Sequence, residues 1–331
     1  MLASPWLFVW TFALVTGCDV NSTSSTPGAG ANGIAGSSPS AAGNGTTGGT
    51  SGAGGATGGS PGAAGAAPAA GAPATAGTGG VVANAGGSSV AGAAGSASPC
   101  AGALVCDDFE SYTGKPAAPW TVSINNGTVA IDTTKHQSGK QSVKFSTSGA
   151  NAYQRAFIGL EGAPFPIADN AFYGRMMIYA TSAANDGVHW TMIQAEGPVA
   201  AQGVTNAQVR YGGQQMKSLM ANYDSTGKKS DCWQHSATKM PEAQWACMQW
   251  YFDGKTNTQK FWLNGKAIDD LTVTGEGQGC INHDLNDTWY FPQNFAKAYV
   301  GWESYQTDDA REVWIDDVAI GTQPIACPAV N

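Results

Sequence analysis

An arginine and a glutamine with two glycines between them, after a tyrosine, form the stretch of this chain best suited to contact a ligand. They lie in the segment Arg210-Tyr211-Gly212-Gly213-Gln214. Because side chains alternate along a strand, Arg210, Gly212 and Gln214 would share one face, and the glycines would leave open space above the sheet. An arginine fork binds a carboxylate through parallel hydrogen bonds. The pattern favours a binding face around Arg210 and Gln214, with an arginine that only pairs inside the protein as the alternative.

Three oxygen-rich stretches, far apart in the sequence, contain side chains that could hold a metal ion. They are residues 107–110, 138–142 and 314–317. Calcium takes about six to eight oxygen ligands in a flexible geometry. In a β-jelly-roll the first and last strands lie side by side, which would bring the outer two stretches together. We therefore expect a structural calcium site from the glutamate of the first stretch, an aspartate of the last and oxygens of the middle one. Solvated turn carboxylates are the alternative.

The first of the seven cysteines marks a lipidation site. Residues 1–17 are almost wholly apolar and end in Val15-Thr16-Gly17, directly before Cys18. A short apolar stretch followed by small residues is typical of a signal peptide, and a cysteine at the new amino terminus can accept lipid. We expect an exported protein, lipid-anchored to the bacterial cell envelope or cell surface through Cys18. An ordinary secretory signal with an incidental cysteine is the alternative.

Residues 18–99 are expected to form a disordered tether. From Asn21 to Pro99 the chain is rich in Gly, Ala, Ser, Thr and Pro and has no charged or aromatic residue. Such a composition cannot bury enough apolar surface to offset the entropy lost on folding. Treated as a random coil, the segment would reach on the order of 50 Å. It would hold a following domain away from a membrane surface.

The remaining residues, 100–331, are expected to fold as one acidic domain and to act as a monomer. They hold all 16 Lys and Arg and all but one of the 24 Asp and Glu residues of the chain. This length suffices for one domain with a sizeable core. The negative balance argues against nucleic acid as a partner.

The six cysteines of this domain are Cys100, Cys106, Cys232, Cys247, Cys280 and Cys327. An even number in an exported domain predicts three disulfides. The sequence does not choose among the possible pairings, and Cys232 with Cys247 is the best single guess because a polar loop containing Pro241 separates them. A zinc site would need paired C-x-x-C spacings, and none occurs.

Short runs rich in Val, Ile, Thr, Tyr, Phe and Trp recur along the domain with turn residues between them, which predicts an all-β fold. The clearest hairpin crosses Asp253-Gly254-Lys255, and Asn264-Gly265 favours a further tight turn. This number of strands points to two packed antiparallel sheets in a β-jelly-roll, a concanavalin A-like sandwich. The predicted strands are 128–131, 142–145, 172–179, 190–194, 208–211, 219–223, 245–252, 258–263, 298–302 and 313–320.

The order of several short motifs resembles the fungal cellulose-induced protein family and its bacterial relatives. The motifs are Asp107-Asp108-Phe109-Glu110, Ser138-Gly-x-x-Ser142, Arg210-Tyr-Gly-Gly-Gln214, Trp262-Leu-Asn-Gly265, Gly301-Trp302-Glu303-Ser304-Tyr305 and Trp314-x-Asp316-Asp317. The resemblance implies a jelly-roll with bound calcium, similar in structure to glucuronan and alginate lyases.

The resemblance also implies particular calcium ligands. They would be Glu110, Ser138, Gln141 and one of Asp316 and Asp317. Gln141 stands where the family pattern has Asn, so its amide oxygen is carried on a longer arm.

As a lyase of uronic-acid-containing polysaccharide, the chain would use Arg210 and Gln214 to hold the substrate carboxylate and favour the charge that develops after deprotonation at C5. The candidate bases are His189, Tyr223 and Lys260. Gln208 lies two residues before the arginine, where the family pattern has a His, and it would line the same groove. Each base candidate has an ordinary structural role as its alternative.

Trp302 could line the groove and stack on a sugar ring, although tryptophans in alternating strands are usually core residues. His136, His235 and His283 receive no role. Three functions remain open. They are a lyase that cleaves uronan by β-elimination, a non-catalytic protein that binds glucan or uronan, and an adhesion module, which would expose an apolar patch.

Overall fold

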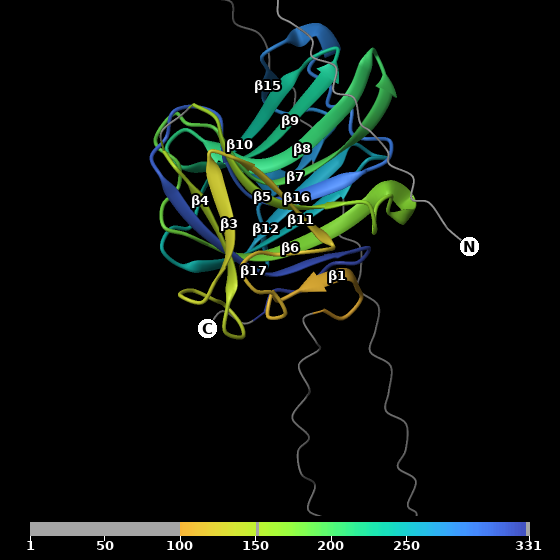
Figure 1. The fold of residues 1–331 in the computed structure, drawn as a ribbon. Coiled ribbons are helices and arrows are strands. Elements are labelled where there is room, and N and C mark those ends of the chain that lie inside the picture. Colours follow the sequence, from red (N-terminus) through yellow and green to blue (C-terminus); the bar gives the residue numbers. More distant parts are fainter. Residues whose placement is uncertain (1–99, 150–151, 329–331) are drawn as a thin grey trace, which may run out of the picture. The chain divides into compact units, whose positions relative to one another are not determined.

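The computed structural model describes residues 100–149 and 152–328 and shows two antiparallel β-sheets packed face to face (Figure 1). The nine-stranded sheet has the order β13-β12-β11-β6-β17-β4-β3, with β1 beside β17 and β14 beside β12. The eight-stranded sheet has the order β15-β10-β9-β8-β7-β16-β5-β2. The predicted β-jelly-roll is confirmed, and its first and last strands, β1 and β17, are neighbours.

The seventeen strands of the described residues are divided between the two sheets. The nine-stranded sheet contains β1 (Ala103–Asp107), β3 (Gly127–Asp132), β4 (Ser142–Thr147), β6 (Ala171–Ala180), β11 (Trp245–Asp253), β12 (Thr258–Leu263), β13 (Lys266–Ala267), β14 (Val273–Thr274) and β17 (Arg311–Gly321). The eight-stranded sheet contains β2 (Trp120–Asn125), β5 (Gln154–Glu161), β7 (Trp190–Ala201), β8 (Val204–Gln214), β9 (Ser218–Gly227), β10 (Asp231–Lys239), β15 (Gly279–Cys280) and β16 (Lys297–Ser304). Three short 3-10 helices are η1 (Ala168–Asn170), η2 (Asp269–Leu271) and η3 (His283–Leu285).

Each predicted strand overlaps an observed one, because β-branched and aromatic residues alternate there with period two. Asn264 and Gly265, which join β12 to β13, both have positive φ (51° and 78°), as the predicted tight turn requires. The prediction missed β1, β2, β5 and β10, and also the two-residue strands β13, β14 and β15. Most residues of β10 are polar, including Gln234 and Ser236 on the same side of the strand as the core residue Cys232, so its sequence lacks a continuous apolar signal.

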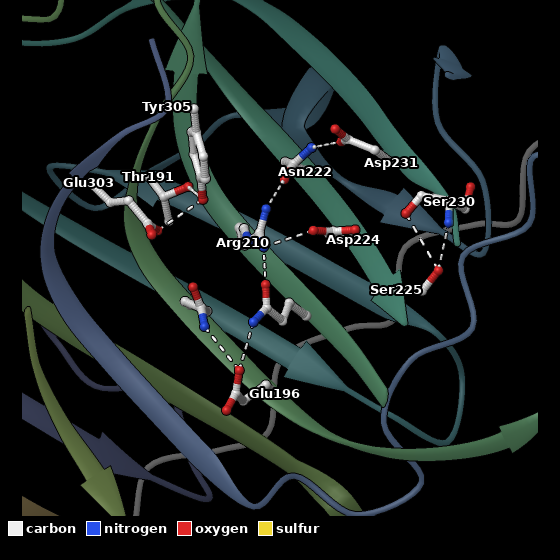
Figure 2. Close-up of polar contacts among 12 residues, drawn as sticks. Thr191, Glu196, Arg210, Asn222, Asp224, Ser225, Ser230, Asp231, Glu303 and Tyr305 are labelled. Atoms are coloured by element: carbon white, nitrogen blue, oxygen red, sulfur yellow. Dashed lines mark hydrogen bonds and ion pairs between the residues drawn. The ribbon is translucent and has the colours of Figure 1, made fainter. Parts of the chain in front are cut away.

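The core lies between the sheets and decides which way each strand faces. On β9, Leu219, Ala221 and Tyr223 point into the core, so Asn222 and Asp224 occupy the opposite face. This opposite face of the eight-stranded sheet, here called the site face, also presents Arg210 from β8 (Figure 2).

Three disulfides are present, as predicted, but the guessed pairing of Cys232 with Cys247 is wrong. Cys232 bonds to Cys280, its direct partner in the pairing of β10 with β15. Cys247 bonds to Cys327, and Cys100 bonds to Cys106. The physical reason is that β10 and β11 belong to different sheets, so their cysteines are separated by the core although they are close in sequence.

The predicted signal peptide, Cys18 and the tether lie outside the described residues. Within 100–149 and 152–328, no helix is long and apolar enough to cross a membrane.

Candidate functional site

Arg210 lies in the middle of the site face, where four side chains surround its guanidinium (Figure 2). It donates to Asn222 Oδ1 at 3.1 Å, to Gln208 Oε1, and to Asp224 Oδ2 at 3.2 Å. The ring of Tyr305 is 5.6 Å from the guanidinium carbon. Arg210 is only 6% exposed. It therefore has partners inside the protein and also lies on the floor of the site.

The network around Arg210 is rich in carboxylates. Gln208 donates to Glu196 Oε2 at 2.8 Å, and Asn222 donates to Asp231 Oδ1 at 3.0 Å. Figure 2 shows these groups as a line across β7, β8, β9 and β10. Burial raises the pKa of Asp231, and the charge of Asp224 adds to this effect. The network around Arg210 is thus acidic.

A pocket of about 330 Å³ opens beside this network. It brings together side chains from the end of β8, from β9 and β10, and from the loops before β7 and after β16. Gln214, expected to bind the substrate, lines it. The other lining residues are His189, Gln215, Met220, Asn222, Asp231, Trp233, His235, Ile281 and Gln306.

His189 is the predicted base that the structure places in this pocket. Its ring centroid is 4.6 Å from that of Tyr305. Its Nε2 is buried and has no hydrogen-bond partner among the described residues. Burial, with the nearby positive charge of Arg210, lowers the pKa of His189 to about 3. The imidazole is therefore neutral at pH 7 and can accept a proton only from a bound group that it contacts.

Tyr305 is a functional candidate that sequence reasoning missed. Its hydroxyl donates to Glu303 Oε2 at 2.9 Å and lies 3.1 Å from Thr191 Oγ1 (Figure 2). Burial raises the pKa of Tyr305 well above its ordinary value, so the phenol keeps its proton. The motif Gly301–Tyr305 is visible in the sequence, but the sequence does not show that Tyr305 contacts Glu303, Thr191 and Arg210.

Glu303 fixes the hydroxyl of Tyr305 through a hydrogen bond and is itself held by two further donors. It accepts hydrogen bonds from Tyr153 Oη and, at 2.9 Å, from Arg155 Nη1 on the neighbouring strand. This ion pair is almost wholly buried on the Glu303 side, where the side chain is 3% exposed. The carboxylate is thus occupied by three donors and serves to fix the tyrosine.

Three predicted site residues lie elsewhere. Tyr223 is 0% exposed and stacks on Trp289 in the core, with ring centroids 5.7 Å apart. Trp302 is also 0% exposed and stacks on Trp190. Lys260 is exposed on β12 of the other sheet. Because alternation puts the first two on the core side of their strands, neither a base at Tyr223 nor sugar stacking on Trp302 is possible, and Lys260 is equally excluded as a base.

Of the predicted calcium ligands, Glu110 contacts the loop before β4 at Gln141, and Ser138 of the same loop contacts Asp317. Glu110 Oε1 accepts the backbone amides of Lys140 (2.8 Å) and Gln141 (3.0 Å). A Cβ on Gly139, whose φ is +58°, would lie 2.3 Å from the same oxygen, so only glycine allows this approach. Gln141 Nε2 donates to the backbone oxygens of Phe109 and Tyr112.

The two aspartates of β17 have different surroundings. Both oxygens of Asp316 accept backbone amides, from Gln137, Ser138 and Asp317. Asp317 Oδ1 accepts Ser138 Oγ at 3.0 Å, but its Oδ2 is buried without a hydrogen-bond partner in the described part of the chain. The hydroxyl of Ser138 and the open, buried oxygen of Asp317 are oxygen donors of the kind that calcium takes. Asp317, not Asp316, therefore has the oxygen available for an ion.

Comparison with solved structures finds several chains that are similar to this one. The "Cellulose induced protein, Cip1" is 26% identical, with a TM-score of 0.52 over 68% of this chain and 100% of that one. An endo-β-1,4-glucuronan lyase from the fungus Trichoderma reesei is 13% identical, with a TM-score of 0.48 over 64% and 94%. The alginate lyase vAL-1 from Chlorella virus is 11% identical, with a TM-score of 0.42 over 62% and 93%. Comparison with curated proteins finds no match.

Residues 108–323 match a polysaccharide-lyase-like family described as "Cip1-like, core domain". This range contains both sheets except for β1, together with Arg210, the pocket and the aspartates of β17. The resemblance inferred from the motifs is thereby confirmed: the chain belongs to the Cip1-like core-domain family.

Proposed function

We propose that this protein is an exported polysaccharide lyase that cleaves uronic-acid-containing chains by β-elimination at the site face. The observation that carries the proposal is the pairing of a neutral His189, whose buried Nε2 has no hydrogen-bond partner among the described residues, with a protonated Tyr305 beside Arg210. Membership in a polysaccharide-lyase-like family supports it. Base, acid and carboxylate-binding group are the three parts that β-elimination requires.

In this mechanism His189 Nε2 takes the proton from C5 of the uronic acid. The electrons of the C5–H bond form the C4–C5 double bond, the bond from C4 to the glycosidic oxygen breaks, and Tyr305 supplies a proton to the leaving oxygen. Arg210 and Gln214 hold the carboxylate, whose charge grows in the transition state. Preorganised donors at a site of developing charge are worth most where water is excluded.

A non-catalytic carbohydrate-binding function is the second candidate, and one observation favours it. Arg210 already donates to Gln208 and Asp224, and further carboxylates lie near it. A uronate would have to compete with Asp224 for the guanidinium. In that case the pocket would hold a glycan chain through hydroxyl contacts to Asn222 and Asp231 without cleaving it.

Incubation with glucuronan, alginate and neutral glucans separates the two functions. β-Elimination leaves an unsaturated uronic acid at the new chain end, which absorbs in the ultraviolet. We expect absorbance to rise with a uronan and to be lost in His189→Gln and Tyr305→Phe. Binding without any absorbance change on every uronan would reject the lyase and leave the binding protein.

The calcium site and the membrane anchor belong to the same proposal. We propose that Glu110, Ser138, Gln141 and Asp317 hold a structural calcium ion, which would neutralise the buried carboxylate. The open Oδ2 of Asp317 supports this assignment. We further propose that the protein is a monomer anchored by lipid at Cys18. Three disulfides support the exported location, because such bonds persist outside the cytosol.

A further inference from the structure

The nine-stranded sheet carries three neighbouring aromatic side chains on the face that turns away from the core. They are Tyr173 on β6, Tyr251 on β11 and Trp262 on β12, here called the aromatic platform. The ring centroids of Tyr173 and Tyr251 are 4.6 Å apart, and those of Tyr173 and Trp262 are 6.4 Å apart. The core side of these strands is filled by other residues, such as Phe252 and Phe261. The platform is therefore not needed for the core.

The platform is partly exposed and has a hollow on each side. One pocket, of about 280 Å³, is lined by Tyr173, Trp262 and Gln249 among others. A second, of about 360 Å³, is lined by Tyr173, Tyr251 and Asp169 among others. Tyr173 borders both, so the two hollows adjoin across its ring. Pockets that combine aromatic faces with a few polar groups are typical ligand sites.

Gln249 provides an independent indication of a ligand. Its Nε2 donates to the backbone oxygen of Ile325 at 2.6 Å, which fixes the amide. Its Oε1 is buried and has no hydrogen-bond partner in the part of the chain described. Because a buried acceptor without a donor costs free energy, a hydroxyl donor in the adjoining pocket would be stabilising.

A second group of outer aromatic residues on this sheet differs from the platform because lysine side chains lie over its rings. Tyr179 and Trp314 lie edge to face, with centroids 5.8 Å apart, and Trp245 flanks Tyr179. Lys135 Nζ lies 4.6 Å above the ring of Tyr179, and Lys144 Nζ lies 4.9 Å above that of Trp314. These rings already have cationic partners from the protein. No lysine or arginine lies over the platform rings in the described residues.

We propose that the aromatic platform is a second carbohydrate-binding site, for a neutral chain of β-linked hexopyranose units. Sugars whose hydroxyls are equatorial present flat faces of axial C–H groups, which stack on tyrosine and tryptophan rings, while their hydroxyls reach flanking polar atoms. Neither pocket lining includes Lys or Arg, and the one carboxylate, Asp169, is paired with Lys255 at 2.8 Å. The two pocket linings thus hold no cation for a uronate and suit an uncharged glycan; the exposed Lys260, the register partner of Tyr251, lies outside both linings. It lies on the sheet opposite to Arg210 and does not depend on catalysis there.

The test is calorimetric titration of the full-length protein with cellohexaose as the neutral probe and a glucuronan oligosaccharide as the charged one. We expect Trp262→Ala and Tyr173→Ala each to weaken cellohexaose binding by roughly 3- to 10-fold, the size of a lost aromatic contact. Trp262→Phe should keep most of the affinity. Trp245→Ala is the matched control, an outer aromatic of the same sheet beside the lysine-covered rings, and should bind as the wild type does. Melting curves confirm that each variant is folded.

Four results would overturn the proposal. One is the absence of cellohexaose binding at millimolar concentration, and another is wild-type affinity in both Trp262→Ala and Tyr173→Ala. A third is loss of cellohexaose binding in Trp233→Ala, in the pocket of the other sheet, with no loss in the platform variants. The fourth is a dimer in sedimentation that Trp262→Ala dissociates, which would mean that a second copy covers the platform. Failure of the lyase proposal is a separate result, because it concerns product from uronan and variants of His189 and Tyr305.

Discussion

We propose both a binding and a structural role for Arg210, which changes what its removal should do. From the sequence, an arginine between solvent and sheet could be truncated with little effect on stability. The structure instead shows a nearly buried guanidinium bonded to Asn222, Gln208 and Asp224. Gln214 lines the pocket without such a network. The two residues therefore separate stability from binding.

We predict that Arg210→Ala lowers the free energy of unfolding by about 1 to 3 kcal/mol, because it leaves the polar partners without their donor. Gln214→Ala should change it by less than about 0.5 kcal/mol while weakening glycan binding roughly 2- to 10-fold, the range for one neutral hydrogen bond. Chemical denaturation and titration measure the two effects. Equal stability in both variants would show that the network around Arg210 contributes nothing.

His189 should make the fold sensitive to acid. Its pKa is about 3 in the folded protein and about 6.5 in the unfolded chain. Below pH 6.5 the unfolded chain binds a proton that the folded protein excludes, so stability is lost as the pH falls from about 6.5 toward 3. We predict that between about pH 7.5 and 4.5 the wild type loses roughly 2 to 3 kcal/mol more than His189→Gln.

The measurement is denaturant unfolding of both proteins at several pH values, with the difference between them isolating His189 from the carboxylates. Parallel curves for the two proteins would contradict a buried neutral imidazole. The same low pKa predicts that kcat/KM on a cleaved uronan shows no acidic limb near pH 6.5, since the base stays deprotonated there.

The loop before β4 and the middle of β17, which carries Asp316 and Asp317, together form the proposed calcium site. Chelation in metal-depleted buffer should lower the melting temperature, because an ion that binds only the folded state stabilises it by mass action. Asp317→Asn should abolish this sensitivity. Asp316→Asn is the matched neighbour, and it should reduce stability while keeping the response to calcium, since Asp316 bonds only to backbone amides. A chelator response that survives in Asp317→Asn and is lost in Asp316→Asn would reverse the assignment.

The segment that follows β17 is held against β11 and β6 by one disulfide and several polar contacts. Cys327 bonds to Cys247 across a separation of 80 residues. Arg175 Nη1 donates to the backbone oxygen of Ala326 at 3.0 Å. Because Ile325 lines a pocket beside the aromatic platform, this segment also helps to shape that surface.

We predict that the double change Cys247→Ser with Cys327→Ser costs more stability than Cys100→Ser with Cys106→Ser. In the chain-entropy account, a disulfide that closes a longer loop constrains the unfolded state more, and the separations of 80 and 6 residues differ by about 2 kcal/mol. Denaturant midpoints of the two variants under oxidising conditions measure the difference. A larger loss in the Cys100 and Cys106 variant would show that native contacts, and not loop closure, govern these bonds.

We propose that each sheet presents one functional face and that the two faces can be used at once. The site face presents an acidic, partly buried network around Arg210, and the outer face of the nine-stranded sheet presents the aromatic platform. A neutral glycan held on the platform would keep the protein on a mixed polysaccharide while the site face engages a uronic acid. Lipid at Cys18 would then hold both faces near the cell.

We predict that the wild-type protein partitions into detergent, because an acyl-modified terminus inserts in micelles and membranes. Cys18→Ser should release a soluble form with an unchanged melting temperature, since the change lies far in sequence from residues 100–328. Mass spectrometry of the amino terminus identifies the lipid. A wild-type protein recovered entirely in the medium with an unmodified terminus would contradict the anchor.

Much of this architecture could be predicted because it depends on local patterns. Alternating β-branched and aromatic residues specify strands, Asn264-Gly265 specifies its turn, and the ordered motifs identify the family. The strand that carries Arg210 and Gln214 could be predicted for the same reason, because the two residues and the glycines between them belong to one short stretch of sequence. Predicting these strands, this turn and the family does not require the pairing between strands.

Only the tertiary structure decided which side each strand turns to the core and which distant residues meet. Tyr223 is opposite in parity to Asn222, the register partner of Arg210, so it faces the core and cannot serve as the base. A register shift in the pairing of β17 with β6, between Asp316 and Ala319, gives the two aspartates different surroundings. Side-chain alternation is known from the sequence, but its phase depends on long-range register, bulges and packing between sheets.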